Sequence, residues 1–143
     1  MFVELKGKRV LLVEDNEMNR QISKELLEAH GIDVYEAEDG DVAVRMVKSA
    51  KRRPFDFILM DIMMPVMDGY EATIAIRALE NKKLATIPII AMTSAITQED
   101  KVKAIEVGMN AHLSKPVDIP ELLSTIRNVM VSYKPEKKAK GLK

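Results

Sequence analysis

Several short apolar runs of the sequence are followed by side chains that could do chemistry. A pair of carboxylates, Glu14 and Asp15, follows one run, and a single carboxylate, Asp61, ends another. Two further runs lead to two hydroxyls and an ammonium group, at Thr93, Ser94 and Lys115. Three carboxylates that come together repel one another unless a cation lies among them. Oxygen ligands without His or Cys select Mg²⁺, with Mn²⁺ as the alternative.

Asp61 is the residue on which this chemistry would centre. Beside a divalent cation its carboxylate stays ionised at neutral pH and can attack the phosphorus of a phosphoryl group. Lys115 would supply a positive charge for the phosphoryl oxygens, and Thr93 a hydroxyl donor. The product would be an aspartyl phosphate. Each residue alone has a simpler interpretation, as a turn residue, a helix-terminal charge or a surface cation, but their joint occurrence at strand ends favours the chemical one.

Short aliphatic runs alternate with longer amphipathic segments, and this alternation predicts an α/β fold. The predicted strands are residues 9–13, 33–37, 57–60, 87–92 and 111–113. The predicted helices are residues 16–30, 41–50, 70–79, 97–108 and a last helix that begins after Asp118. Thr97 with Asp100 forms a variant of the capping box at the start of the fourth helix, and Gly31 is a natural stop for the first.

Five βα units in series predict a parallel sheet with helices on both faces, because each crossover is right-handed and covers the sheet. The common doubly wound order for five strands is 2-1-3-4-5. In that order the carboxyl ends of strands 1, 3, 4 and 5 lie side by side. We therefore expect the acidic pair, Asp61, Thr93 and Lys115 to converge at one edge of the sheet.

Four motifs of the sequence resemble the receiver domain of two-component response regulators. They are LLVEDN at 11–16, LMDIMMPVMDG at 59–69, MTSA at 92–95 and LSKP at 113–116. The resemblance covers about residues 7–132, with residues 1–6 as a lead-in or linker and the Lys-rich residues 133–143 as a tail or linker. The residues of these motifs are most similar to those of receivers attached to hybrid sensor histidine kinases. It implies the flavodoxin-like (βα)5 receiver fold.

The resemblance also implies roles for individual residues. Asp61 would accept a phosphoryl group from the phosphohistidine of a histidine kinase or a histidine phosphotransfer protein. Thr93 and Lys115 would bind that group, and the Lys115–Pro116 peptide bond would be cis. The Mg²⁺ ligands would be the three carboxylates and one backbone carbonyl, from Glu14, Asp15, Asp61 and Met63.

The switch implied by the resemblance joins the site to a binding face. Thr93 and His112 would move on phosphorylation and remodel the face made by helix 97–108, strand 111–113 and the last helix, where an output partner would bind. Two positions that handle the hydrolytic water in the family are Met63 and Ala95 here. Neither side chain can hydrogen-bond to a water, so slow self-dephosphorylation is expected.

The first helix is the expected docking element for a four-helix-bundle partner that carries the phosphohistidine. The candidate contacts are Met18, Asn19 and Ile22, which lie beside the acidic pocket. Met18 and Ile22 share a helical stripe with Leu26, so they could equally belong to the core. The sequence leaves these two alternatives open.

Composition excludes several other function classes. The chain of 143 residues has no cysteine, which excludes thiol catalysis, and its two histidines are too few for a His-based zinc site. It has no Trp and no basic stripe interleaved with aromatics, so nucleic-acid binding is not expected. No long apolar run and no signal peptide occur, which predicts a cytoplasmic domain without membrane contact. We expect a monomer or a weak dimer.

Two alternatives stand beside the receiver of a hybrid kinase. The chain could be a stand-alone receiver that signals by binding. A small phosphatase of the haloacid-dehalogenase type fits less well, since its nucleophile lies on the first strand in an Asp-x-Asp pair. In either receiver form the chain would phosphorylate itself on Asp61 without being a conventional enzyme. In the first form its parent protein would be a hybrid histidine kinase.

Overall fold

The computed structural model describes residues 5–94 and 97–133 of the chain. Its five parallel strands form one sheet in the order β2-β1-β3-β4-β5. The strands are β1 (Arg9–Val13), β2 (Asp33–Ala37), β3 (Phe57–Asp61), β4 (Ile89–Thr93) and β5 (Ala111–Ser114). The predicted doubly wound, flavodoxin-like α/β fold is thereby confirmed.

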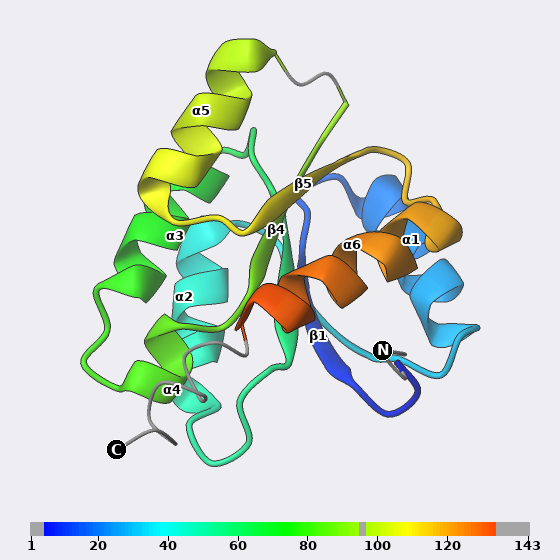
Figure 1. Ribbon diagram of the computed structural model, residues 1–143, viewed down its shortest axis with the longest axis horizontal. Coiled ribbons are helices and arrows are strands. Elements are labelled where there is room, and N and C mark those ends of the chain that lie inside the picture. Colours follow the sequence, from blue (N-terminus) through cyan, green and yellow to red (C-terminus); the bar gives the residue numbers. More distant parts are fainter. Residues whose placement is uncertain (1–4, 95–96, 134–143) are drawn as a thin grey trace.

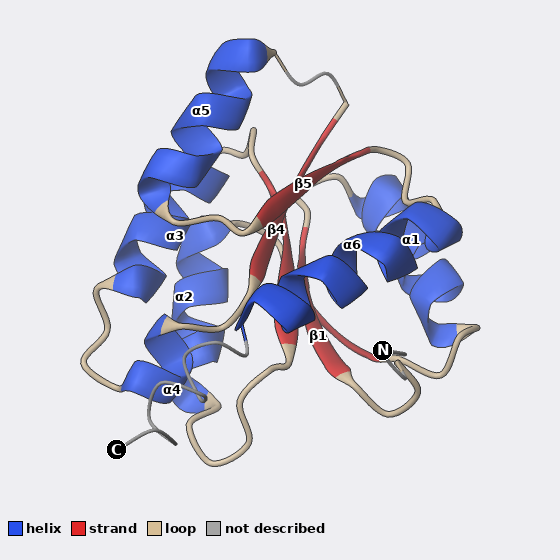
Figure 2. Ribbon diagram, in the orientation of Figure 1, coloured by secondary structure: helices blue, strands red, loops and turns tan. Residues whose placement is uncertain are grey.

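The helices lie in two layers, one on each face of the sheet (Figures 1 and 2). On one face are α1 (Glu17–Glu28) and α6 (Ile119–Tyr133). On the other are α2 (Gly40–Ser49), α3 (Gly69–Arg77) and α5 (Gln98–Val107). The parallel strands between these layers need no solvent-facing side, which is why β3 and β4 are buried at every residue.

Two hydrophobic clusters fill the space between the sheet and its two helical layers. Alternate residues of β1 point into opposite clusters: Leu11 and Val13 into the first, Val10 and Leu12 into the second. This alternation follows from the two-residue period of a strand. Leu5 also packs into the second cluster, so the packed domain begins at least two residues before the boundary at residue 7 that we expected.

The structure adds one helix to the predicted elements. A short helix, α4 (Lys82–Ala85), lies between α3 and β4, where no helix was predicted. Its N-cap is Asn81, whose side chain accepts a hydrogen bond from the Lys83 amide. One helical turn is too short to show the 3.6-residue period on which a prediction depends.

The predicted start and stop signals are present where they lie in the described residues. Thr97 and Asp100 form a capping box at the start of α5, and Gly108 ends that helix with a φ of 107°. Gly31 follows α1 with a φ of 80°. Among the described residues, no helix is both long and apolar enough to cross a membrane.

Candidate functional site

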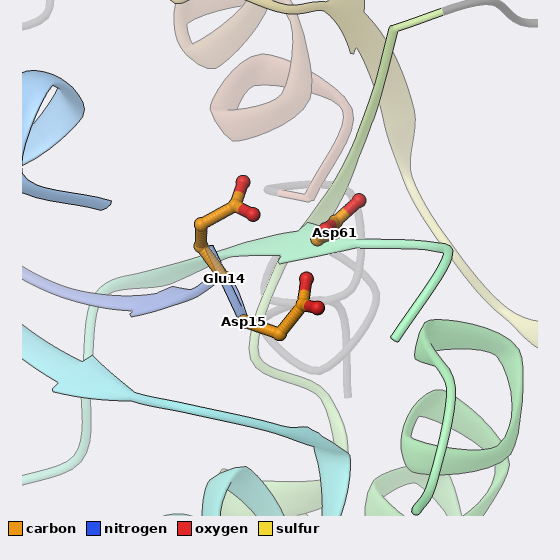
Figure 3. A group of neighbouring side chains, drawn as sticks. All are labelled: Glu14, Asp15 and Asp61. Atoms are coloured by element: carbon orange, nitrogen blue, oxygen red, sulfur yellow. The ribbon is translucent and has the colours of Figure 1, made fainter. Parts of the chain in front are cut away.

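The polar residues picked out in the sequence come together at the carboxyl edge of the sheet. Asp61 is the last residue of β3, and Glu14 and Asp15 directly follow β1. Figure 3 shows the three carboxylates grouped at these strand ends. One oxygen from each residue lies within 4.8 Å of one oxygen from each of the others. The prediction that these three carboxylates converge is confirmed.

Lys115 completes the group from the end of β5. Its Nζ lies 2.8 Å from Glu14 Oε1 and 3.2 Å from Asp61 Oδ2. Glu14 and Asp61 are almost fully buried, at 2% and 3% exposure, whereas Asp15 is exposed. The two buried carboxylates, of Glu14 and Asp61, therefore share the Lys115 ammonium group. The Asp15 carboxylate beside them is exposed to solvent.

Burial and the neighbouring charges shift the pKa values of Asp61 and Lys115. Burial, and after it the neighbouring Glu14 charge, raise the pKa of Asp61 to about 7 even though Lys115 acts to lower it. Burial alone would lower the pKa of Lys115, but its bonds to Glu14 and Asp61 outweigh this and raise it. The lysine thus stays charged, and Asp61 is the carboxylate that a further cation would stabilise most.

The cluster fits a hard divalent cation. It offers three carboxylates, and Mg²⁺ is bound by few carboxylates together with water and phosphate oxygens. Burial and the Glu14 charge both raise the pKa of Asp61, and a bound cation would favour the ionised carboxylate against both effects. The donor set therefore suits Mg²⁺ in both chemistry and charge.

Glu14 is held at every polar group. Its amide donates to the Ala37 carbonyl at 3.1 Å, and its carboxylate accepts from the Asn16 amide at 3.1 Å as well as from Lys115. Its carbonyl accepts from Arg20 Nη1 at 2.8 Å. Sequence reasoning missed Arg20, because nothing in its spacing shows that an arginine on a helix turns back onto the preceding loop.

The remaining phosphoryl-site residues lie around this cluster. Thr93 is buried at the end of β4, and its carbonyl accepts a hydrogen bond from the Lys115 amide at 3.0 Å. The Lys115–Pro116 peptide bond is cis, which is the isomer that the resemblance implies. Met63, whose carbonyl is a predicted ligand, has a side chain that is 73% exposed. Ala95 lies outside the described residues.

Gly69 shows how tightly the loop after Asp61 is folded against β3. Its amide donates to the Ile62 carbonyl at 2.9 Å. A Cβ at this position would lie 2.4 Å from the Asp61 carbonyl oxygen, so the close approach requires glycine. Asp68 and Glu71 then form a capping box that starts α3. The chain thus leaves the strand end at once, and the Asp61 side chain remains at the edge.

The structure separates the two alternatives for α1. Met18 is 71% exposed and Ile22 is 46% exposed, and Asn19 is exposed as well. Met18 and Ile22 therefore belong to the surface, not to the core. Asn19 and Ile22 border a hollow of about 360 Å³ that reaches Lys115 and Pro116.

His112 lies apart from the carboxylates. It is exposed on β5 and lines a hollow of about 580 Å³ between α5, β5 and α6. The structure thus places it on the predicted output face and not in the core of the sheet.

The family model of the response regulator receiver domain matches residues 10–127. The chain belongs to this family. As a receiver domain it is a component of two-component phosphorelay signalling. The four sequence motifs that resemble this family all overlap the matched residues.

Several similar curated proteins are much longer than this receiver. It is 40% identical over 125 residues to hybrid signal transduction histidine kinase I of Dictyostelium discoideum, and 39% identical over 136 residues to probable histidine kinase 2 of Oryza sativa subsp. indica. These matches cover 86% and 87% of the chain but only 7% and 13% of the relatives. Polar-differentiation response regulator DivK of Brucella anthropi is 33% identical and matches over 86% of the chain and 96% of its own length.

Solved structures of receivers have the same fold. The receiver domain of the histidine kinase CKI1 from Arabidopsis thaliana, complexed with Mg²⁺ and BeF₃⁻, has a TM-score of 0.79 and 35% identity, and covers 89% of this chain and 92% of its own. A receiver domain of a sensor histidine kinase from Pseudomonas aeruginosa PAO1 has a magnesium ion coordinated in its active site cleft. Its TM-score is 0.73 at 42% identity, over 85% of this chain and 96% of its own.

Proposed function

We propose that Asp61 is the phosphoacceptor of this receiver and takes a phosphoryl group from a phosphohistidine. The single observation that supports this most is the arrangement around its carboxylate. Asp61 is buried at a strand end, its Oδ2 lies 3.2 Å from Lys115 Nζ, and two further carboxylates lie within 4.8 Å. A carboxylate placed in this way is a nucleophile with charge stabilisation already assembled beside it.

The transfer forms one bond and breaks one bond. An Asp61 carboxylate oxygen attacks phosphorus as the bond from phosphorus to the donor imidazole nitrogen breaks, and the electron pair of that bond stays with the imidazole. Lys115 Nζ, already beside Asp61, donates to the phosphoryl oxygens, and the Thr93 hydroxyl donates to another of them. Transfer loosens the contact between Lys115 and Asp61, because the lysine charge is then shared with the phosphoryl group.

The carboxylates of Glu14, Asp15 and Asp61, with the Met63 carbonyl, would hold Mg²⁺, and Mn²⁺ would serve in its place. When bound, the cation supplies positive charge that keeps Asp61 ionised and offsets the charge of the phosphoryl oxygens. Glu14 binds Lys115 and Asn16 already, so its position depends little on the cation. Asp15, which is exposed, is the ligand that can adjust.

The donor would be a histidine kinase or a histidine phosphotransfer protein that docks on the exposed part of α1. Met18, Asn19 and Ile22 provide an apolar and amide surface next to the carboxylates. The high identity to receivers within long histidine kinases favours a segment of a hybrid kinase in the cytoplasm over a stand-alone receiver. Residues 7–132, extended to include Leu5, would then form the receiver between two linkers.

The proposal is tested by incubating the protein with acetyl phosphate and Mg²⁺ and measuring its intact mass. Wild type gains one phosphoryl group, and Asp61→Asn gains none. Asp41→Asn is the matched control, because Asp41 lies on α2 in an exposed ion pair with Arg45 and its variant should be phosphorylated like wild type. Phosphorylation of Asp61→Asn, or of neither protein, would overturn the assignment.

The expected slow self-dephosphorylation is a second part of the proposal. Met63 and Ala95 offer no side-chain hydrogen bond to a water. Met63→Asn and Ala95→Glu should therefore shorten the phosphoryl lifetime, measured by the loss of the adduct mass after the donor is removed. If both variants keep the wild-type lifetime, these two positions do not control hydrolysis.

The output face would be made by α5, β5 and α6, with Thr93 and His112 as the switch residues. His112 borders the hollow on this face, which gives its ring room to move. His112→Ala should leave phosphorylation intact but reduce the change in partner affinity that phosphorylation produces. An unchanged affinity difference, measured by calorimetry with the isolated partner, would remove His112 from the switch.

A further inference from the structure

We propose that Arg20 is a positioning residue for the acidic site: its guanidinium holds the turn from Glu14 to Asp15 so that both carboxylates stay directed toward Asp61. This inference rests on the proposed function, because it concerns the residues that would hold the divalent cation. Arg20 would not touch the cation or the phosphoryl group. Its effect would pass through the backbone of the turn.

The Arg20 side chain reaches back from the first turns of α1 to two other elements. Its Nη1 donates to the Glu14 carbonyl at 2.8 Å, and its Nε donates to Glu36 Oε1 at 3.0 Å. Only 15% of the side chain is exposed. Glu36 lies on β2 and pairs in register with Leu12 of β1. One guanidinium therefore joins α1, β2 and the turn that carries the acidic pair.

Glu36 is itself fixed by a second cation. Its other oxygen, Oε2, lies 3.1 Å from Lys24 Nζ, one helical turn beyond Arg20. Burial would raise the pKa of Glu36, but its bonds to Lys24 and Arg20 outweigh this and lower it. The carboxylate therefore stays ionised at neutral pH. Glu36 is bound by Lys24 as well as by Arg20, so it is a fixed partner for the planar guanidinium. The guanidinium is thereby oriented with Nη1 toward the Glu14 carbonyl.

The Glu14 carbonyl matters because it belongs to the peptide group that joins Glu14 to Asp15. The orientation of this peptide group sets the direction in which the Asp15 side chain leaves the backbone. The Asp15 carboxylate is exposed, and no hydrogen bond from the described residues holds it. The backbone alone thus aims Asp15, and Arg20 is the side chain that fixes this part of the backbone.

An arginine suits this position better than a lysine would. The guanidinium presents several N–H donors in a fixed plane, so it can serve the Glu14 carbonyl and the Glu36 carboxylate at the same time. A lysine carries one flexible ammonium group at the end of a chain. Arg20→Lys should keep the charge but lose the simultaneous contact, whereas Arg20→Gln should lose both.

The test measures Mg²⁺ binding by calorimetry and the phosphorylation rate with acetyl phosphate as a function of Mg²⁺. Residues that orient metal ligands typically change affinity by about 10- to 100-fold when they are removed. We expect Arg20→Gln to weaken Mg²⁺ binding by about tenfold, near the lower limit, and Arg20→Lys by less. The rate at saturating Mg²⁺ should stay near the wild-type value. Arg45→Gln is the matched control, since Arg45 is 66% exposed and its ion-pair partner among the described residues is Asp41, one turn earlier on α2.

A merely structural role would give a different pattern. It would lower the melting temperature of Arg20→Gln in metal-free buffer and leave the Mg²⁺ affinity of the folded protein unchanged, and that result would overturn the inference. Glu36→Gln provides a second variant if Arg20→Gln does not fold: it keeps Arg20 but removes its charged anchor, and it too should bind Mg²⁺ more weakly. Unchanged binding there would also count against the inference. Failure of wild type to bind Mg²⁺ would instead overturn the proposed function.

Discussion

Two helices that flank the sheet, α1 and α5, are held in different ways. In α1, Leu27 is fully buried, and Arg20 and Lys24 form ion pairs with Glu36 on the neighbouring strand. In α5, Ala104 is the buried residue, and Ile105 is 74% exposed. The hollow of about 580 Å³ also borders α5. The side of the receiver that carries the acidic pair is thus firmly packed, and the side proposed for output is lightly packed.

Polar contacts from α3 compensate for the small apolar contact of α5. Near the start of α5, the Tyr70 hydroxyl donates to Asp100 Oδ1 at 3.0 Å, and Lys103 Nζ lies 4.5 Å from the centre of the Tyr70 ring. Near its end, Arg77 Nε donates to the Gly108 carbonyl at 2.9 Å. A helix held at its two ends by a few polar contacts can be shifted without disturbing a large core.

Among the substitutions that test how α5 is held, Arg77→Ala should have the largest effect, because it releases the end of this helix. Besides Gly108, Arg77 donates to the Ala85 and Ile87 carbonyls and to Asn110 Oδ1. Loss of these charge-assisted bonds should lower the free energy of unfolding by about 3 kcal/mol, measured by urea titration. Hydrogen exchange should rise in α5 and not in α1. An equal rise in both helices would show that α5 is not separately anchored.

Asp61→Asn should raise the free energy of unfolding, and it changes the side of the receiver that is firmly packed. Because the pKa of folded Asp61 is raised to about 7 from 3.8, the folded state keeps a proton that the unfolded state has lost between these values. Wild type therefore loses stability as the pH rises through this range, and the variant does not. In metal-free buffer at pH 8 we expect the variant to be more stable by about 2 kcal/mol, since one pKa unit corresponds to about 1.4 kcal/mol and solvent screening reduces the effect of the full shift.

The control for this prediction is the same measurement at pH 4 and with Mg²⁺. The difference should nearly vanish at pH 4, where the carboxyl is neutral in wild type as well. Saturating Mg²⁺ should also reduce it, because a cation that binds the folded state stabilises wild type. A difference that is independent of pH would contradict the charge repulsion inferred at Asp61.

Tyr70→Phe should have a smaller and more local effect. The substitution removes the hydroxyl that bonds Asp100 but keeps the ring beneath Lys103. The free energy of unfolding should fall by about 1 kcal/mol, the usual value for one hydrogen bond. Amide exchange should increase in the first turn of α5 and remain unchanged at its end, where Arg77 still holds Gly108. Unchanged exchange throughout α5 would mean that the hydroxyl is not an anchor.

Ile105→Gln should have the smallest effect. Because this side chain is 74% exposed, its replacement should change the free energy of unfolding by less than about 0.5 kcal/mol. Leu27→Ala in α1 is the matched comparison, and there the loss should be about 3 kcal/mol because the side chain is fully buried. Similar losses in the two variants would contradict the difference in packing between α1 and α5.

The sequence predicted the fold because the strands and helices of this chain have clear periods and end signals. The runs around Leu11 and Leu59 are continuous apolar segments of buried parallel strands, and Thr97 and Asp100 form the expected cap. The helix α4 escaped prediction because a single turn has no period to recognise. β4 begins at Ile89, later than predicted, after a proline that has no N–H for the sheet.

The candidate site could be predicted because the strand order could be predicted. Once β1, β3, β4 and β5 are neighbours, the residues at their ends converge, and this is how Asp61 and Lys115 were found. The exposure of Met18 could not be predicted, because the helical period places it on the same stripe as buried residues. Arg20 and Arg77 could not be found either, since long side chains choose partners by three-dimensional proximity that the spacing of residues does not encode.

The contact between Lys115 and Glu14 joins residues that are 101 positions apart in the chain. During synthesis the three carboxylates leave the ribosome long before the lysine does, and β5 is made after the other four strands of the sheet. A partly made or partly folded chain therefore carries the acidic residues without the ammonium group between them. Phosphorylation of Asp61 would consequently serve as a test of completed assembly, since only a chain whose fifth strand has docked presents the whole pocket to its donor.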